Sequence, residues 1–348
     1  MSQMVSGSTA EAERPTAESV VVVEKLTKAF GQMKAVDEIS FDIKRGEIFG
    51  FLGPNGAGKS TTINMLTTLI PPTSGKAEVC GFDIAKHATD VRRNVGVVPQ
   101  EYTADEDMTG LRNILLCADL YGIPRSNSKA HAMELLGLVE LTDAKDRKVS
   151  TYSGGMRRRL ELACGLINYP KLLFLDEPTL GLDVQTRAAV WKYIKKLKED
   201  YGMTLFVTTH YLEEADSLCD RIAIIDHGHI IKIGTPDVLK EAVGGDVIVV
   251  GVREAGPDIS GEIARIGLVK DVRKMDNDYR IKVERGEEAS PQIMDLIRSK
   301  GLHVARISLT KPTLDDAYLE LTGRTLREEE TNRWSIVSQR RTMRQARS

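Results

Sequence analysis

Residues 47–61 read EIFGFLGPNGAGKST: an apolar run, a glycine-rich turn and then the first residues of a helix. The turn at 53–60 fits the pattern G-x-x-x-x-G-K-[ST] at every position, and it has the strand before it and the helix after it that this motif requires. Glycine lets the backbone curl tightly, so that successive N–H groups point inward at phosphate oxygens. The stretch predicts a binding site for a nucleoside triphosphate.

Two side chains at the end of the turn add chemistry to this backbone cradle. Lys59 can reach the β and γ phosphates, and Ser60 offers a hydroxyl to Mg²⁺. The positive end of the helix that starts near Lys59 strengthens the same field. The predicted nucleotide-binding residues are Gly53, Pro54, Asn55, Gly56, Ala57, Gly58, Lys59, Ser60 and Thr61.

A second phosphate-site signal lies at 171–178, which reads KLLFLDEP. Its apolar residues predict a buried strand that delivers Asp176 to its carboxyl end, where ligands sit in open α/β sheets. Asp176 is expected to hold Mg²⁺, directly or through water. Glu177 follows outside the strand, where a carboxylate can accept a proton from an attacking water, so we predict it as the general base.

Strands and helices alternate over much of the chain, which indicates a largely parallel sheet covered on both faces. A mostly helical block between about 100 and 170 reads as an inserted subdomain. The expected strands are 20–26, 39–43, 47–52, 171–175, 203–208 and 222–225, and the expected helices outside that block include 60–70 and 185–198.

From residue 246 onward, the chain has a separate pattern of predicted strands and helices. Its pattern predicts the order β-α-β-β-α-β, the split ferredoxin-like arrangement, followed by a short helix at 312–321. We therefore expect a small α+β domain at 246–324. Residues 1–18 read as a disordered arm, and 325–348 as a mostly disordered polar tail.

Composition excludes several classes of protein. With 348 residues, 41% of them hydrophobic, the chain can build two ordinary domains. No apolar run exceeds six residues, whereas a membrane-spanning helix needs about 20. Four cysteines without a Cys-x-x-Cys pair indicate neither a zinc site nor a disulfide framework. A net charge of −2 argues against a general nucleic-acid binder.

Five motifs in order carry a family resemblance: GPNGAGKST (53–61), VVPQ (97–100), YSGGM (152–156), LDEPTLGLD (175–183) and VTTH (207–210). Over roughly residues 20 to 240 the chain resembles the ATP-binding subunits of ABC transporters. YSGGM, together with PTLDDAYL at 312–319, resembles the drug-export branch typified by daunorubicin-resistance ATPases.

The resemblance implies a fold and an assembly. It implies a P-loop ABC ATPase domain at 19–242, with a mostly parallel sheet, an antiparallel β part and a helical subdomain at about 101–168. Ser153 is expected to cap a helix whose free N–H groups form a second anion site. In the family this helix faces the P-loop of a partner, so Ser153, Gly154, Gly155 and Met156 would contact ATP across a dimer with a second copy or a related chain.

The same resemblance assigns four further residues. Phe30 lies where the family places an aromatic that stacks on adenine. Gln100 would approach Mg²⁺ and the attacking water, Asp183 would act across the dimer, and His210 could contact the γ-phosphate. Met156 departs from the usual Gln after the two glycines and is followed by three arginines.

The implied function is ATP hydrolysis coupled to transport, with export of drugs or other hydrophobic compounds. Because this chain has no apolar 20-mer, the expected partner is a separate multi-spanning permease, with the ATPase at the cytoplasmic face of the membrane. No nucleic acid is expected. The alternatives are a soluble ABC-type ATPase that acts on ribosomes or DNA, and a small-molecule kinase with the same P-loop.

Overall fold

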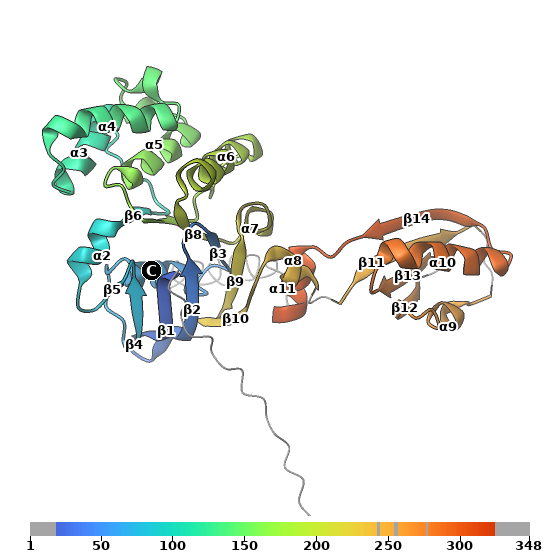
Figure 1. Cartoon of the computed structure of the whole chain (residues 1–348). Helices are drawn as coiled ribbons and strands as arrows, with labels where there is room; N and C mark the ends of the chain where they lie inside the picture. Colours follow the sequence, from blue (N-terminus) through green and yellow to red (C-terminus); the bar gives the residue numbers. More distant parts are fainter. Residues whose placement is uncertain (1–18, 242–243, 254–256, 276–277, 324–348) are drawn as a thin grey trace, which may run out of the picture. The chain divides into compact units, whose positions relative to one another are not determined.

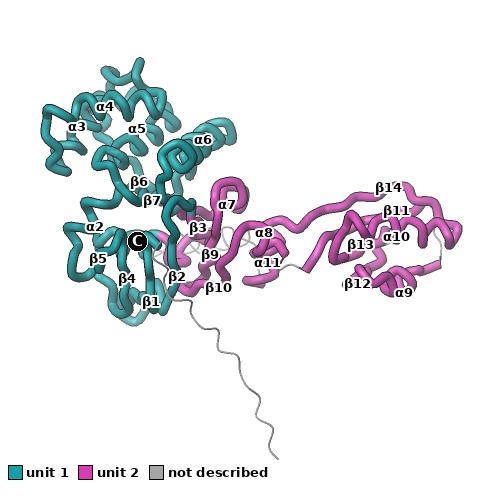
Figure 2. Tube along the Cα trace, viewed as in Figure 1, with its two compact units in different colours: residues 1–48, 60–206 teal, residues 49–59, 207–348 magenta. Residues whose placement is uncertain are grey.

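A computed structural model of the chain describes residues 19–241, 244–253, 257–275 and 278–323 (Figure 1). The predicted arm at 1–18 and tail at 325–348 lie outside the described residues. The chain divides into two compact units, residues 1–48 with 60–206 and residues 49–59 with 207–348 (Figure 2).

The first unit contains an antiparallel sheet of the order β2-β1-β4-β5. Its strands are β1 (Ser19–Phe30), β2 (Met33–Lys44), β4 (Ser74–Val79) and β5 (Phe82–Asp83). Apolar side chains such as Val21 and Ile43, paired across β1 and β2, are buried. The β1–β2 turn passes through Gly31 at a φ of 61°, which glycine adopts without strain. This sheet is the antiparallel β part that the family resemblance implies.

The first unit also holds a parallel strand pair, β6 (Val95–Val98) and β7 (Leu172–Asp176). Every residue of β7 is buried, as its continuous apolar run predicts. A Cβ added to Gly96 of β6 would lie 2.0 Å from the carbonyl oxygen of Gly165. Glycine at 96 therefore allows the helix that carries Gly165 to approach the sheet closely.

Helices α3 (Gly110–Leu120), α4 (Arg125–Leu138) and α5 (Gly154–Leu166) form the inserted block, drawn in green in Figure 1. The three helices contact one another in every pair and bury an apolar centre that includes Ile114 and Leu160. Two short 3₁₀ turns, Thr142–Ala144 and Val149–Thr151, lead from α4 to α5. The other elements of the 60–206 segment are α1 (Lys59–Leu66), α2 (Ala88–Asn94) and α6 (Val184–Tyr201), followed by β8 (Thr204–Thr209).

In the second unit β3 (Ile48–Leu52) pairs in parallel with β9 (Arg221–Asp226), which pairs antiparallel with β10 (His229–Gly234). All residues of β3 are buried, so the strand that leads into the glycine turn is a rigid support for it. Two short helices, α7 (Leu212–Leu218) and α8 (Pro236–Glu241), flank β9 and β10 in the chain.

The end of the second unit is an α+β layer with antiparallel strands in the order β12-β13-β11-β14. Its elements are β11 (Asp246–Val252), α9 (Ser260–Ile263), β12 (Val269–Met275), β13 (Asp278–Val283), α10 (Gly286–Ser299) and β14 (Val304–Thr310). Ile248 and Ile281 of the sheet pack with Ile263 of α9 and Ile293 of α10 in one core. The element order is the one that the sequence predicts. Helix α11 (Leu314–Thr322) contacts α7 and α8 instead.

Several helix boundaries differ from those predicted, and among them α6 continues to Tyr201 where the sequence predicted its end at 198. Helix α1 ends at Leu66, although the sequence predicted a helix to residue 70, because Thr68 adopts a left-handed φ of 63°. The N–H groups of Leu69 and Ile70 then turn back to the carbonyl of Asn64. Helix α11 starts after Thr313, whose hydroxyl and backbone form a capping box with Asp316, so the proline at 312 lies before the helix and not in its first turn.

Candidate nucleotide-binding site

The glycine turn 53–59 lies between β3 and α1 and is tightly folded on itself. Gly56 and Gly58 adopt φ values of 84° and 109°, which side chains with a Cβ rarely reach. A Cβ on Gly53 would lie 2.2 Å from the carbonyl oxygen of Ile225, so only glycine fits there. The motif's glycines are thus required by backbone geometry, which is what a phosphate cradle needs.

Lys59 is buried, with 4% of its surface exposed, and its side chain folds back over the turn. Its Nζ donates to the carbonyl oxygens of Gly53, at 2.7 Å, and of Pro54, at 3.1 Å. The ammonium group therefore lies inside the loop whose N–H groups would face phosphate. A buried cation at this position is suited to the negative charge of a triphosphate.

His210 belongs to the same unit as the glycine turn. The N–H of Gly53 donates to the carbonyl of Thr209 at 3.2 Å, so the turn begins beside the end of β8 and His210 follows at once. The imidazole is partly buried against the ring of Tyr211, with ring centroids 4.1 Å apart. The backbone thus brings a histidine next to the cradle, as the motif order implies.

Asp176 and Glu177 lie at the carboxyl end of β7, in the unit that also holds Ser60 and Gln100. Both carboxylates are buried, with 8% and 4% of their surfaces exposed. Glu177 has a left-handed φ of 48°, an uncommon conformation for a residue with a Cβ. Such strain costs about 1–3 kcal/mol and is concentrated at functional sites.

Ser153 is the N-cap of α5, and its hydroxyl accepts a hydrogen bond from the N–H of Met156 at 3.3 Å. Gly154 and Gly155 form the first turn of the helix. A Cβ on Gly155 would lie 2.5 Å from the Cγ2 of Thr186 on α6, so the second glycine permits close contact between the two helix starts. The helix that we call the Ser-Gly-Gly helix is therefore capped as predicted.

Asp183 caps the neighbouring helix α6. Its two carboxylate oxygens accept hydrogen bonds from the N–H of Thr186, at 3.0 Å, and from the Thr186 hydroxyl, at 2.6 Å. The bond from the Thr186 hydroxyl contributes most, and the bond from the N–H adds to it, so that the pKa of Asp183 lies below its usual range. The carboxylate is therefore ionised at neutral pH, and its contribution to stability would be lost only as the pH falls through this lowered pKa.

Phe30 and Gln100 both present exposed side chains. Phe30 ends β1 with half of its surface exposed, and the Nζ of Lys28 lies 5.2 Å from the centre of its ring. Gln100 follows β6, and its backbone carbonyl accepts a hydrogen bond from Arg158 of the Ser-Gly-Gly helix at 2.8 Å. An exposed aromatic is available for stacking, while the position of Gln100 depends on a helix 58 residues further along the chain.

The predicted site residues fall into the two units. Within the first unit, Arg158 of α5 donates to Gln100, and the starts of α5 and α6, capped by Ser153 and Asp183, meet at Gly155 and Thr186. Within the second unit, Gly53 is hydrogen-bonded to Thr209, which His210 follows. Sequence reasoning missed Thr186, which fixes the Asp183 carboxylate. The sequence did contain a signal for this contact. In Asp-x-x-Thr, an N-cap aspartate is followed three residues later by a threonine whose N–H and hydroxyl can both donate to it.

The residues present fit Mg²⁺. The hydroxyl of Ser60 and the carboxylate of Asp176 are hard oxygen donors in the same unit. Mg²⁺ in nucleotide-binding proteins is held by one or two such side chains together with the substrate's phosphates.

Two family models match the chain. The model described as "ABC transporter" matches residues 36–180, and the one described as "ATP-binding protein DrrA1-3-like, C-terminal domain" matches residues 234–322.

Among the helices in the described ranges, none is both long enough and apolar enough to cross a bilayer.

Named relatives align over most of the chain. The daunorubicin resistance ATP-binding protein DrrA3 of Streptomyces coeruleorubidus is 40% identical over 310 residues, which cover 88% of this chain and 97% of that protein. The linearmycin resistance ATP-binding protein LnrL of Bacillus subtilis is 39% identical, with 88% and 99% covered. The Nod factor export ATP-binding protein I of Sinorhizobium fredii is 37% identical, with 90% and 89% covered.

Solved structures show the same fold. A dimeric structure of the ATP-binding cassette MJ0796 in a post-hydrolysis state, bound to ADP and Pi, matches with a TM-score of 0.56 and 28% identity, covering 62% of this chain and 98% of that one. CbiO1 from Clostridium perfringens matches with a TM-score of 0.60 and 26% identity, covering 65% and 93%. This chain is therefore an ATPase of the ABC transporter family and belongs to its drug-resistance and export branch of ATP-binding subunits.

Proposed function

We propose that this chain drives export of a drug or another hydrophobic compound, as two ATPase copies or as one copy with a related chain, through a separate multi-spanning permease. One observation carries the proposal: the complete set of five motifs occurs together with the DrrA-like C-terminal domain. The relatives that share both parts are named for resistance to, or export of, such compounds. The ATPase domain would span 19–242 and the C-terminal domain 246–324.

Each site residue has a proposed role. The backbone of 53–58 and the Lys59 ammonium bind the phosphates, and Phe30 stacks on adenine. Ser60, Asp176 and Gln100 would hold Mg²⁺, which would neutralise part of the phosphate charge. His210 contacts the γ-phosphate, and Asp183 acts across the dimer from its fixed position at the start of α6.

Glu177 is proposed as the general base. Its buried carboxylate at the end of β7 would accept a proton from the water that attacks the γ-phosphate. Ser153 and its two glycines would bind the same phosphate from the partner chain. ATP thus closes the dimer, and hydrolysis removes the γ-phosphate contacts that held it closed, so the dimer reopens.

The permease partner would place this chain at the cytoplasmic face of the membrane. The test is purification of the full chain from detergent-solubilised membranes, followed by measurement of ATP turnover in the purified material. We expect a stoichiometric protein with several apolar spans to co-purify. Association with ribosomes or DNA in its place would contradict the proposal and favour the soluble ABC-type alternative.

Phe30→Ala is expected to weaken ATP binding by about tenfold, because base–aromatic stacking is worth roughly 1–3 kcal/mol. The measurement is calorimetric titration with ATP·Mg²⁺. Phe30→Tyr, which keeps the aromatic face, should bind ATP like the original chain. Inorganic tripolyphosphate provides the control ligand, since it has no base to stack; an equal loss of its affinity in Phe30→Ala would contradict the stacking role.

A further inference from the structure

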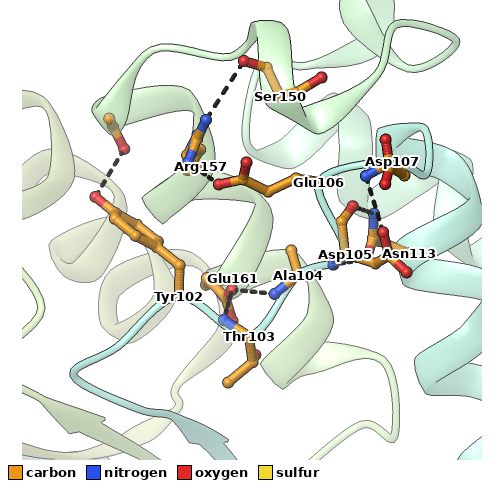
Figure 3. A network of polar contacts seen from close by, with 11 residues as sticks. Tyr102, Thr103, Ala104, Asp105, Glu106, Asp107, Asn113, Ser150, Arg157 and Glu161 are labelled. Carbon is orange, nitrogen blue, oxygen red and sulfur yellow. Dashed lines mark hydrogen bonds and ion pairs between the residues drawn. The ribbon is translucent and has the colours of Figure 1, made fainter.

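The segment from residue 99 to residue 107, which follows β6 and contains Gln100, is hydrogen-bonded to the Ser-Gly-Gly helix α5 by two buried charged side chains, Arg158 and Glu161. Figure 3 shows the contacts of Glu161. Glu161 of α5, with 2% of its surface exposed, accepts hydrogen bonds from the N–H groups of Thr103 and Ala104 at 2.7 and 2.8 Å. Its second oxygen accepts from the Thr103 hydroxyl at 2.8 Å. Three donors thus converge on one buried carboxylate, and bonds to a charged acceptor are the strong ones.

Arg158 holds the start of the same segment. Its side chain is buried, with 1% of its surface exposed, and its two terminal nitrogens donate to the carbonyls of Pro99 at 2.7 Å and Gln100 at 2.8 Å. Its guanidinium carbon also lies 5.1 Å from the centre of the Tyr102 ring. A planar fork that reaches two successive carbonyls is specific to arginine, since lysine offers a single point charge.

Two further residues of the segment, Tyr102 and Glu106, also contact α5. Arg157 pairs with Glu106, and the hydroxyl of Tyr102 donates to the carbonyl of Gly154 in the first turn of the helix (Figure 3). Arg158 and Glu161 are three residues apart, so they lie on one face of α5. Ser153 caps the same helix, about 12 Å from Glu161 at 1.5 Å per residue.

The third arginine of the run behaves differently. Arg159 donates to the carbonyl of Val139, at 3.0 Å, and to the hydroxyl of Tyr193, at 3.3 Å. Of the three consecutive arginines, Arg157 and Arg158 therefore contact the segment at 99–107, whereas Arg159 contacts the end of α4 and a side chain of α6. The ATPase motifs alone do not explain why Arg157 and Arg158 contact the segment at 99–107.

We propose that Arg158 and Glu161 are positioning residues that make Gln100 and Ser153 move as one body. The inference rests on the proposed function, in which Gln100 approaches the chain's own ATP and Ser153 the partner's. Because α5 is a continuous helix, Ser153 cannot be displaced relative to Arg158 and Glu161 without bending it. Contacts at the two nucleotides therefore form and break together.

The test compares variants in the full chain. Arg158→Lys and Glu161→Leu should lower kcat for ATP hydrolysis by about tenfold, within the range found for residues that couple two sites, while ATP affinity of the single chain stays unchanged. Glu161→Gln keeps an oxygen for the two N–H groups and should restore most of the activity. Arg159→Lys is the matched control on the same helix and should behave as the original chain.

A second readout separates coupling from simple structural support. Amide hydrogen exchange of residues 99–107 and 153–161 should slow together when ATP·Mg²⁺ is added to the original chain. In Arg158→Lys and Glu161→Leu, only one of the two segments should respond. Circular dichroism melting identifies a variant that fails to fold. If Glu161→Leu fails to fold, the test of the positioning role rests on Arg158→Lys, which keeps the positive charge and the aliphatic part of the side chain.

The outcomes are distinguishable from failure of the proposed function. If the original chain neither binds nor hydrolyses ATP, the proposed function fails and the positioning role fails with it. If the original chain hydrolyses ATP and the folded Arg158→Lys variant matches it in kcat and in joint exchange of the two segments, only the positioning role is overturned.

Discussion

Glu177→Gln is expected to lower ATP turnover by about 10²- to 10⁴-fold, the contribution of a positioned general base. Glutamine fills nearly the same volume at the buried end of β7 but cannot accept the proton from water. ATP binding should be retained, and an ATP-bound dimer should accumulate because the γ-phosphate is not removed. The measurements are steady-state phosphate release and size-exclusion chromatography with and without ATP·Mg²⁺.

Glu38→Gln is a suitable control for this variant. Glu38 has a φ of 49°, nearly the same left-handed backbone as Glu177 at 48°, but its side chain is exposed and lies outside the proposed site. Any cost of placing glutamine in a left-handed conformation therefore appears in both variants. Turnover at the original rate in Glu177→Gln would show that another group accepts the proton.

Lys59→Ala should weaken ATP binding by about one to two orders of magnitude, because hydrogen bonds to a charged group contribute roughly 1.5–3 kcal/mol. The loss should be largest for ATP, smaller for ADP and absent for adenosine, since the Lys59 ammonium lies at the turn proposed to bind the β and γ phosphates. Titration with the three ligands measures this order.

Lys86→Ala provides the control for that experiment, since Lys86 is an exposed lysine outside the motifs. Because Lys59 donates to the carbonyls of Gly53 and Pro54, its removal also takes a partner from the turn, so the melting temperature is measured in parallel. A folded Lys59→Ala variant that binds ATP as tightly as the original chain would contradict the cradle.

Much of the fold follows from local pattern. The short, uninterrupted apolar runs of β3 and β7 are typical of buried strands in a parallel sheet, and the turn between β3 and α1 is dictated by its glycines. The strand β10 was not predicted: its sequence, HIIKIG, shows no regular alternation of apolar and polar residues, and the strand forms by pairing with β9. The end of α1 was also missed, because a threonine in a left-handed conformation leaves no sequence signal.

The sequence by itself determined the phosphate cradle, the strand that delivers Asp176 and Glu177, and the cap of the Ser-Gly-Gly helix, since each depends on residues within one short stretch. Only the tertiary structure decided what the arginines after Met156 and the glutamate at 161 do. The partners of Arg158 and Glu161 lie more than 50 residues away, at Pro99 to Ala104, and become neighbours only when α5 packs beside β6. A buried charge reveals its role through the groups that solvate it, and those groups are brought to it by the fold.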